Sequence, residues 1–555
     1  MFEKKSQGDK TDTNRMEFSD WLWLLAVAGI GSANRINHLS TQVIMGDEMH
    51  ALYRALLHPM IYNFTHFQST DNCIPLTLYY QWVLNSFGLS EAWMRFPMLL
   101  SGTISLILIP HVLGKVFGRA VGLLLAFLLS FSLVHIYYSR FARPYVIVQL
   151  LEFIAMASYF VWLKRPRVKF ALIYAISIIS AIFFHLSAIL FLLSTQFYGF
   201  AYMLWSGKIR SRSDHTRPTW NMFWGIVLAV TIGLALLLGP AFFFSYGNLE
   251  QILGKGKFDW ATVSGYAAIL AGTNNVILKS IFFLFSALGL YGLFKKYIVL
   301  GIYALFLIFL PLVMAILVHP YKLEVPFVLV RYTIGNLPLI LALFALGIRE
   351  IPRLFSESLF MPDKFSKILF SAISFCYVSS IFWTSPVPSM LTRPTSFDLS
   401  PQIFKFEKAE KLPFSEFYER LTKGPEKGVL IEYPWDWNGR RSRLFYLRQR
   451  SHEWRVIGAY SLWGHDLFND PRLHMANCLF IMNPEHIAGM GAQFLIVHKN
   501  IDKEFKIFHG EVDMNNWPEA EPYVIQRVLG TCTQWFGKAI YEDRYITVFK
   551  LPSHK

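Results

Sequence analysis

Long apolar stretches alternate with short basic connections along the first 385 residues of the chain. The hydrocarbon core of a membrane is about 30 Å thick, so a helix that crosses it needs about 20 apolar residues. The stretch 170–205 would extend about 54 Å as one helix, so two crossings with a turn at His185 and Ser187 fit better. The pattern predicts about eleven spanning helices. They are expected at 19–37, 94–114, 120–138, 144–163, 170–205 (as a hairpin), 221–246, 276–294, 297–318, 332–348 and 367–384.

The basic connections all fall on one side of the membrane in this arrangement. They are the N-terminal tail, Lys115 and Arg119, 164–169, 208–217, Lys295 and Lys296, and 349–367. Cytoplasmic loops carry the excess of Lys and Arg, so the N-terminus is predicted to be cytoplasmic. An odd number of crossings then places the chain after Pro386 outside. We therefore expect a multi-pass protein of the cell (inner) membrane with an extracytoplasmic C-terminal part.

That C-terminal part reads as a separate domain. Short β-type runs at 429–431, 494–497 and 545–549 alternate there with polar helical segments. The predicted organisation is a transmembrane module at 1–385, with a first extracytoplasmic loop at about 38–93, and a soluble α/β domain at 386–555. Aromatic clusters at 433–437 and 460–465 could stack on a sugar, but most buried aromatic side chains fill a core, and the core interpretation is favoured.

Composition supports the membrane assignment and excludes one class of partner. Of 555 residues, 54% are hydrophobic and only 16% are charged. The net charge of +15 could suggest nucleic acid, but the basic residues are divided among the connections between apolar runs, which indicates topology and no nucleic acid. The four cysteines show no metal-ligand spacing.

The first outside loop carries the acidic pair Asp47 and Glu48, followed by His50, His58 and Tyr79. Long loops beside a rigid bundle are common sites of function. A carboxylate held at the membrane surface could act as a general base. An acidic pair in an outside loop is, on its own, more often simply solvated.

Two arginines in the second outside loop oppose the trend that places cations inside. Arg140 and Arg143 lie between Tyr138 and Tyr145. They could anchor the loop at lipid headgroups, or hold a phosphate at membrane depth; these two explanations weigh about equally.

Two further sites place candidate residues at the outer face. Arg331 and Tyr332 precede a late span. His185 is at the predicted hairpin, where a lone histidine is more often a packing residue than a ligand.

The order of these features resembles the GT-C superfamily of lipid-linked-sugar glycosyltransferases. The features are the acidic pair of the first loop, 91–97 leading into the second span, the second-loop sequence 138–145, His185, and Arg331 with Tyr332 before 336–338. The resemblance covers roughly residues 20–350. Within the superfamily, the chain is most similar to bacterial protein O-mannosyltransferases and aminoarabinose transferases, of the glycosyltransferase family 39 type.

The resemblance implies an enzyme that moves a sugar from a polyprenyl-phosphate carrier to an acceptor hydroxyl outside the cell, with inversion. The acceptor would be a glycan, a lipid or a protein, and membrane lipids would be further partners. Asp47 would be the base, with Glu48 positioning it, and Arg140, Arg143 and Arg331 would bind the donor phosphate. The remaining candidates for the substrate site are His50, His58, Tyr79, Tyr138, Tyr145, His185 and Tyr332.

One position departs from the family. Many members carry histidine, and the aminoarabinose transferases a metal-binding acid, where this chain has Asn72 and Cys73. No cofactor is expected with certainty, and a divalent metal ion stays open.

The main alternative is a transporter or flippase of lipid-linked sugars. Such a protein would carry charges along a path through the bundle, whereas Glu152 is the main acid within the predicted spans. A scaffold that merely anchors the C-terminal domain would not explain the arginines of the second loop.

Overall fold

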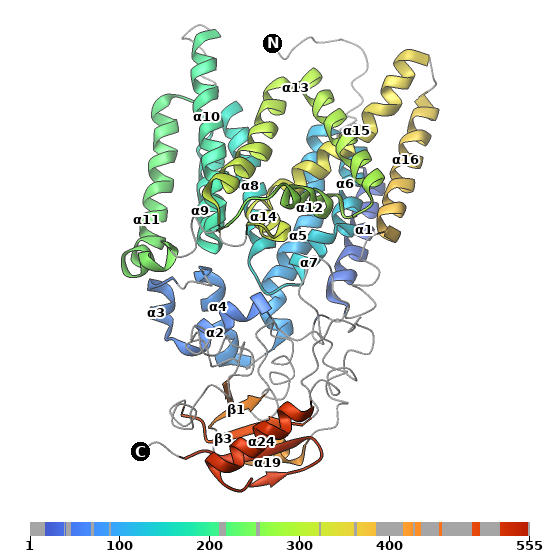
Figure 1. The fold of residues 1–555 in the computed structure, drawn as a ribbon. Helices are drawn as coiled ribbons and strands as arrows, with labels where there is room; N and C mark the ends of the chain where they lie inside the picture. The colour runs from blue at the N-terminus through green and yellow to red at the C-terminus, as the bar shows by residue number, and fades with distance from the viewer. Residues whose placement is uncertain are drawn as a thin grey trace.

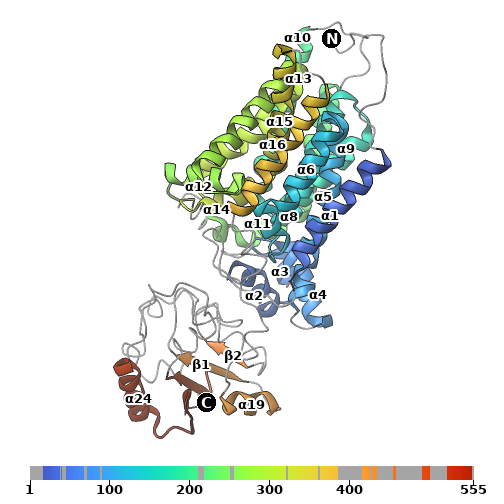
Figure 2. The ribbon, with the colours of Figure 1, turned by 90° about the vertical axis from the view of Figure 1, so that its right-hand side faces the viewer.

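The protein is a bundle of long helices with a small sheet beyond one of its ends (Figures 1 and 2). The computed structural model describes residues 17–37, 39, 46–67, 72–87, 90–209, 218–250, 256–320, 323–359, 363–384, 415–425, 428–433, 454–457, 491–499 and 522–552. The helices of the bundle lie within 18–384, and all strands lie within 429–550.

Helices occupy every stretch that was predicted to span the membrane. They are α1 (Phe18–Ile36), α5 (Glu91–Phe117), α6 (Arg119–Phe131), α7 (Leu133–Ser139), α8 (Tyr145–Lys164), α9 (Val168–Phe184), α10 (Ile189–Ile209), α11 (Trp220–Glu250), α13 (Val276–Val318), α15 (Asn336–Leu359) and α16 (Asp363–Thr384). By length and composition alone, five helices among the described residues could cross a membrane, or up to seven if each of two bent pairs forms one span. The prediction of a polytopic helical membrane protein is confirmed.

Both predicted reversals of direction are present. α9 ends at Phe184, and a single 3₁₀ turn, η2 (Leu186–Ala188), leads into α10, so the hairpin lies at His185. α13 is continuous over 43 residues except at Tyr297, whose φ of −140° and ψ of 64° are not helical. Figure 1 shows α13 turning back on itself, so its two halves are the two spans predicted at 276–294 and 297–318.

A buried arginine stabilises the bend between α6 and α7. These helices meet at 60° around Ser132. The guanidinium of Arg35, which is fully buried, donates to the carbonyl oxygens of Leu129 and Ser130 at 3.0 and 3.3 Å. These carbonyls belong to the last turn of α6, where carbonyl groups lack the regular helical donors; the Leu129 carbonyl also accepts from the backbone N–H of Ser132 at 3.3 Å. The cation therefore satisfies backbone groups that lipid could not.

Short helices fill the connections that were predicted to lie outside. The first loop contains η1 (Gly46–Glu48), α2 (Met49–Leu57), α3 (Met60–Thr65) and α4 (Ile74–Phe87). The late loops contain α12 (Trp260–Ala271) and α14 (Pro326–Tyr332), neither of which was predicted from the sequence. α14 meets α15 at 92° across a short break, so the chain enters this span at almost a right angle.

The C-terminal part contains a mixed five-stranded sheet in the order β2-β1-β3-β5-β4. β1 pairs in parallel with β2 and β3, whereas β5 is antiparallel to β3 and β4. The predicted runs at 429–431, 494–497 and 545–549 correspond to β1, β3 and β5. The elements are α19 (Glu416–Lys423), β1 (Val429–Tyr433), β2 (Arg455–Ile457), β3 (Phe494–His498), α24 (Pro522–Phe536), β4 (Tyr541–Glu542) and β5 (Ile546–Lys550).

Some predictions fall outside the described residues. The domain boundary at 385/386 is one of them, and so are the aromatic cluster at 460–465 and residues 434–437 of the other cluster. Tyr433, which begins that second cluster, is fully buried in β1.

The late helices approach one another closely through glycine. A Cβ atom on Gly289 of α13 would collide with the carbonyl of Leu343 in α15, and one on Gly347 of α15 would collide with the carbonyl of Phe285 in α13. Small residues at such crossings let helix backbones touch, which is a main source of helix association in lipid.

We therefore expect Gly347→Ala to destabilise the bundle, because overpacking of this kind costs about 1–3 kcal/mol. The measurement is the thermal unfolding midpoint of the detergent-purified protein. Gly239→Ala in α11 is the control, since a Cβ at Gly239 meets nothing within 4 Å. Equal midpoints for the two variants would contradict this account of the contact.

Candidate active site

The site is centred on the carboxylate of Asp47, in the 3₁₀ turn that opens the first loop. Its Oδ2 lies 2.7 Å from Nη1 of Arg331, at the end of α14. Its Oδ1 lies 3.6 Å from Nε2 of His50, one turn further along the chain. The Asp47 side chain is 43% exposed, so its carboxylate is accessible. The first loop and the last turn of α14 thus build one site.

The charges around Asp47 keep it ionised. Burial alone would raise the pKa of the Asp47 carboxyl. The contact with His50 and the positive charges of Arg331 and Arg143 outweigh that effect and hold the pKa well below its usual range. Asp47 is therefore a carboxylate at every physiological pH, and Arg331 makes it a weak base.

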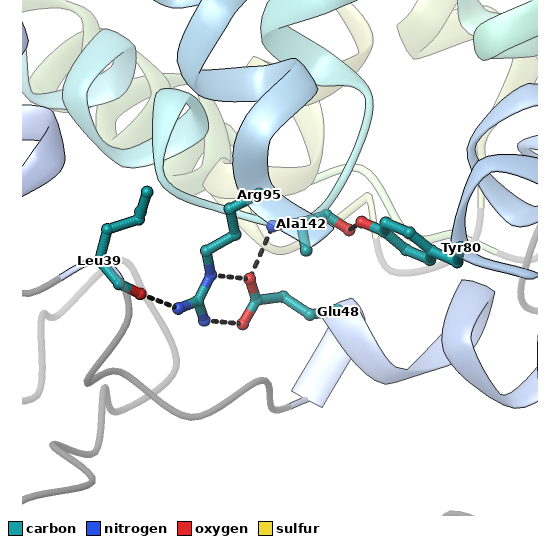
Figure 3. Close-up of polar contacts among 5 residues, drawn as sticks. All are labelled: Leu39, Glu48, Tyr80, Arg95 and Ala142. Atoms are coloured by element: carbon teal, nitrogen blue, oxygen red, sulfur yellow. Dashed lines mark hydrogen bonds and ion pairs between the residues drawn. The ribbon is translucent and has the colours of Figure 1, made fainter. Parts of the chain in front are cut away.

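Glu48 has a different environment from its neighbour. It is 4% exposed, and its two oxygens face Arg95 of α5 at 2.9 Å from Nε and 2.8 Å from Nη2 (Figure 3). Arg95 also donates to the carbonyl oxygen of Leu39 at 2.9 Å. Charge-assisted bidentate pairs of this kind are strong and directional. Glu48 is thus a structural anchor beside Asp47.

The same anchor fixes the second outside loop. Oε1 of Glu48 accepts a hydrogen bond from the backbone N–H of Ala142 at 2.6 Å, and the Tyr80 hydroxyl donates to the carbonyl oxygen of Ala142 at 2.8 Å (Figure 3). Arg95 was not singled out from the sequence. It lies within 91–97, a segment that carried part of the family resemblance, but no role was assigned to it, and its partner lies 47 residues away.

The backbone held at Ala142 separates the two arginines of the second loop. The charge of Arg143 acts on Asp47 and on His185. Arg140 instead lies near Arg95 and Arg35, and its Nη1 donates to the carbonyl oxygen of Asn34 at 2.9 Å. The structure therefore gathers Arg143 and Arg331 around Asp47, with Arg140 on the other side.

Arg140 has hydrogen-bond donors that could bind an anion. Its side chain is 4% exposed, and its Nε and Nη2 have no hydrogen-bond partner within the described part of the chain. Burial and the charge of Arg95 lower the pKa of Arg140 to about 10, so it stays positively charged at neutral pH. A buried cation with unused donors is costly unless an anion or water completes it.

An aromatic wall surrounds Arg331. Its guanidinium carbon lies 5.9 Å from the ring centres of both Tyr145 and Tyr332. The His185 ring sits 5.2 Å from Tyr145 and 5.9 Å from Tyr332. Burial, together with Arg143 and Arg331, lowers the pKa of His185 to about 3. The imidazole is therefore neutral at physiological pH and can accept or donate a hydrogen bond without adding charge.

Tyr138 belongs to the same wall, whereas two other candidates lie elsewhere. The Tyr138 ring stacks on Phe327 of α14 at 5.3 Å, and its buried hydroxyl has no hydrogen-bond partner among the described residues. His58 stacks on Tyr62 at 4.2 Å, at the far end of α2 from His50. Tyr79 donates to the carbonyl oxygen of Trp93 at 2.7 Å, which braces α4 against α5.

The whole chain resembles known structures. The apo structure of ArnT from Cupriavidus metallidurans matches with a TM-score of 0.56 at 10% identity, over 96% of this chain and 98% of ArnT. ArnT bound to undecaprenyl phosphate matches with a TM-score of 0.54 at 11% identity, over 97% and 99%. This chain shares the fold of ArnT. The predicted GT-C type of fold, with its C-terminal sheet, is thereby confirmed.

Other comparisons add less to the ArnT result. The Archaeoglobus fulgidus oligosaccharyltransferase tethered with an acceptor peptide matches with a TM-score of 0.47 at 11% identity, over 92% of this chain and 72% of that one. No protein-family model and no curated protein matches the chain by sequence.

The family resemblance seen in the sequence leaves a divalent metal ion open. Among the described residues, no three His, Cys, Asp or Glu side chains converge as a ligand set. Cys73, at the position where the family resemblance leads one to look for a ligand, is buried in the bundle's core. The chemistry proposed below is written with the side chains of this chain alone.

We expect Glu48→Ala to destabilise the protein strongly. It would leave Arg95 as an unpaired buried cation and the Ala142 N–H without its acceptor, and breaking a buried pair in this way costs about 3–5 kcal/mol. The thermal unfolding midpoint in detergent measures the loss. Glu419→Ala is the control, because Glu419 is 64% exposed in its pair with Lys423 and such pairs contribute little. If both variants unfold at the native midpoint, Glu48 is no anchor.

Proposed function

We propose that the protein is a membrane glycosyltransferase that moves a sugar from a polyprenyl-phosphate carrier to an acceptor hydroxyl on the extracytoplasmic face. The observation that carries the proposal is the accessible carboxylate of Asp47 between the cations Arg331 and Arg143. The fold supports it, because ArnT with the same fold binds undecaprenyl phosphate. The N-terminus would be cytoplasmic, with the site and the sheet outside.

Asp47 acts as the general base in this proposal. The acceptor oxygen forms a bond to the anomeric carbon from the face opposite the carrier, and its proton passes to a carboxylate oxygen of Asp47. The bond between the anomeric carbon and the phosphate oxygen breaks, and its electron pair leaves with the polyprenyl phosphate. At the anomeric carbon one C–O bond forms as another breaks, the acceptor O–H bond is replaced by an O–H bond on Asp47, and the configuration inverts. General bases of this kind contribute about 10²–10⁴ in rate.

The arginines stabilise the negative charge that the leaving phosphate gains. Arg331 and Arg143 are closest to the base, and Arg140 has the unused donors. The pairing of Arg331 with Asp47 also couples binding to catalysis. A donor phosphate that draws Arg331 toward itself weakens the pair, so the pKa of Asp47 rises and the carboxylate becomes a better base when the donor is present.

Hydrogen-bonding and aromatic groups around these charges form the rest of the proposed substrate site. His50 orients Asp47, while Tyr138, Tyr145, Tyr332 and neutral His185 line the side of Arg331. Such side chains offer flat apolar faces and single polar atoms, which suits a sugar ring.

Asp47→Asn should lower the rate of sugar transfer by a factor of about 10²–10⁴, because the amide cannot accept the proton. The assay supplies radiolabelled polyprenyl-phosphate sugars and a crude membrane extract to the purified protein. Asp259→Asn is the matched control, since Asp259 caps α12 in another outside loop and asparagine caps equally well. If Asp47→Asn transfers sugar at the native rate, Asp47 is not the general base. Movement of the carrier across vesicle membranes without any transfer would favour the flippase.

The dependence of kcat/KM on pH should report the environment of Asp47. Because the pKa of Asp47 is depressed, the carboxyl group stays ionised throughout the pH range in which aspartate usually titrates. The rate should therefore fall only when the pH drops through the depressed pKa, below that range. Native protein should therefore show no acid limb from Asp47 between about pH 5 and 8. Arg331→Gln should shift the limb upward into the measurable range. A limb near pH 6 in the native protein would contradict this assignment.

A further inference from the structure

A carboxylate lies deep within the bundle, away from the site. Glu152 of α8 is 2% exposed, and its Oε2 has no hydrogen-bond partner among the described residues. The backbone N–H of Gly335 lies against this carboxyl group and stabilises its negative charge. An ionisable side chain inside a membrane span is costly and is retained for a reason.

Gly335 lies in the break between α14 and α15. The two helices meet there at 92°, and α15 begins at the next residue, Asn336. The first amides of a helix have no internal acceptor and carry its positive dipole end, so a carboxylate is the matching partner. A Cβ atom on Gly335 would collide with Oε2 of Glu152 and approach the Phe191 ring at 2.6 and 2.9 Å. The glycine thus makes room for the carboxylate.

The break determines where α14 points. α14 has only seven residues, and Arg331 is the sixth of them. The Arg331 guanidinium reaches Oδ2 of Asp47 at 2.7 Å. Beyond the break, Asn336 Nδ2 donates to the carbonyl oxygen of Ile308 at 2.9 Å, which holds the start of α15 against α13. A shift at Gly335 therefore moves Arg331 relative to Asp47.

We infer that Glu152 is a positioning residue for the site: it holds the break at Gly335 so that Arg331 stays paired with Asp47. The catalytic meaning of this role rests on the proposed function, but the pairing itself can be measured without activity. Nearby Gln149 provides the comparison. It is one turn away on α8, fully buried, and neither atom of its amide has a partner among the described residues.

The test is carbodiimide labelling of Asp47 in the purified full-length protein, followed by mass spectrometry across pH 4–7. The carboxyl oxygen adds to the carbodiimide carbon at a rate that rises with the protonated fraction of the carboxyl group, so labelling reports the pKa of Asp47. Glu152→Leu should release Arg331 and raise the labelling at a given pH about tenfold, which corresponds to one pKa unit. Glu152→Gln keeps an acceptor for the Gly335 N–H and should label as the native protein does. Gln149→Leu, which removes an equally buried polar group, should also label at the native level.

Two outcomes would overturn the inference. The first is that Asp47 in folded Glu152→Leu is labelled at the native level. The second is that labelling of Asp47 increases equally in Glu152→Leu and Gln149→Leu, which would indicate a general loosening of the bundle. If Glu152→Leu does not fold, Gly335→Ala takes its place, because it displaces the break with Glu152 intact, and native labelling there would have the same meaning. Sugar transfer is measured in parallel. If the native protein transfers no sugar but the variants show the expected labelling pattern, the proposed function is wrong and the positioning role of Glu152 is still supported.

Discussion

The architecture of the site depends on the buried ion pair between Glu48 and Arg95. This pair joins the first outside loop to α5, and through the Ala142 N–H it joins both to the second loop. Desolvating two charges is expensive, and the expense is offset only when the geometry is bidentate and the remaining lone pairs are used. Both conditions hold here, so the loops around Asp47 are held in a fixed position.

Buried charged side chains interact with backbone groups at both broken helices. Arg35 supplies donors to carbonyl oxygens at the end of α6, and Glu152 supplies an acceptor to an amide at the start of α15. Each charge has the sign that its helix end attracts. Lipid offers no alternative partner for such groups, so a broken span requires a side chain to complete it. The charges thus explain how sharp bends persist close to the site.

Much of the fold could be predicted from the sequence, because apolar run length alone decides where a chain can cross lipid. The hairpin at His185 and the reversal of α13 followed from run length and basic flanks. α14 could not be found, since its seven residues merge with the apolar span that follows. The pairing of Glu48 with Arg95 and the divergence of Arg140 from Arg143 depend on how distant backbones meet. The sequence placed Asp47 and Arg331 in loops on the same side, but their contact required the break at Gly335.

The contact between Asp47 and Arg331 spans 284 residues of chain. A membrane protein is inserted from its N-terminus as it is synthesised, so the acidic half of the site is inserted long before the basic half. Until α14 and α15 are in place, the carboxylate has no arginine from α14 beside it. Incomplete chains would therefore lack the complete site, and quality control of insertion would also determine when the site becomes competent.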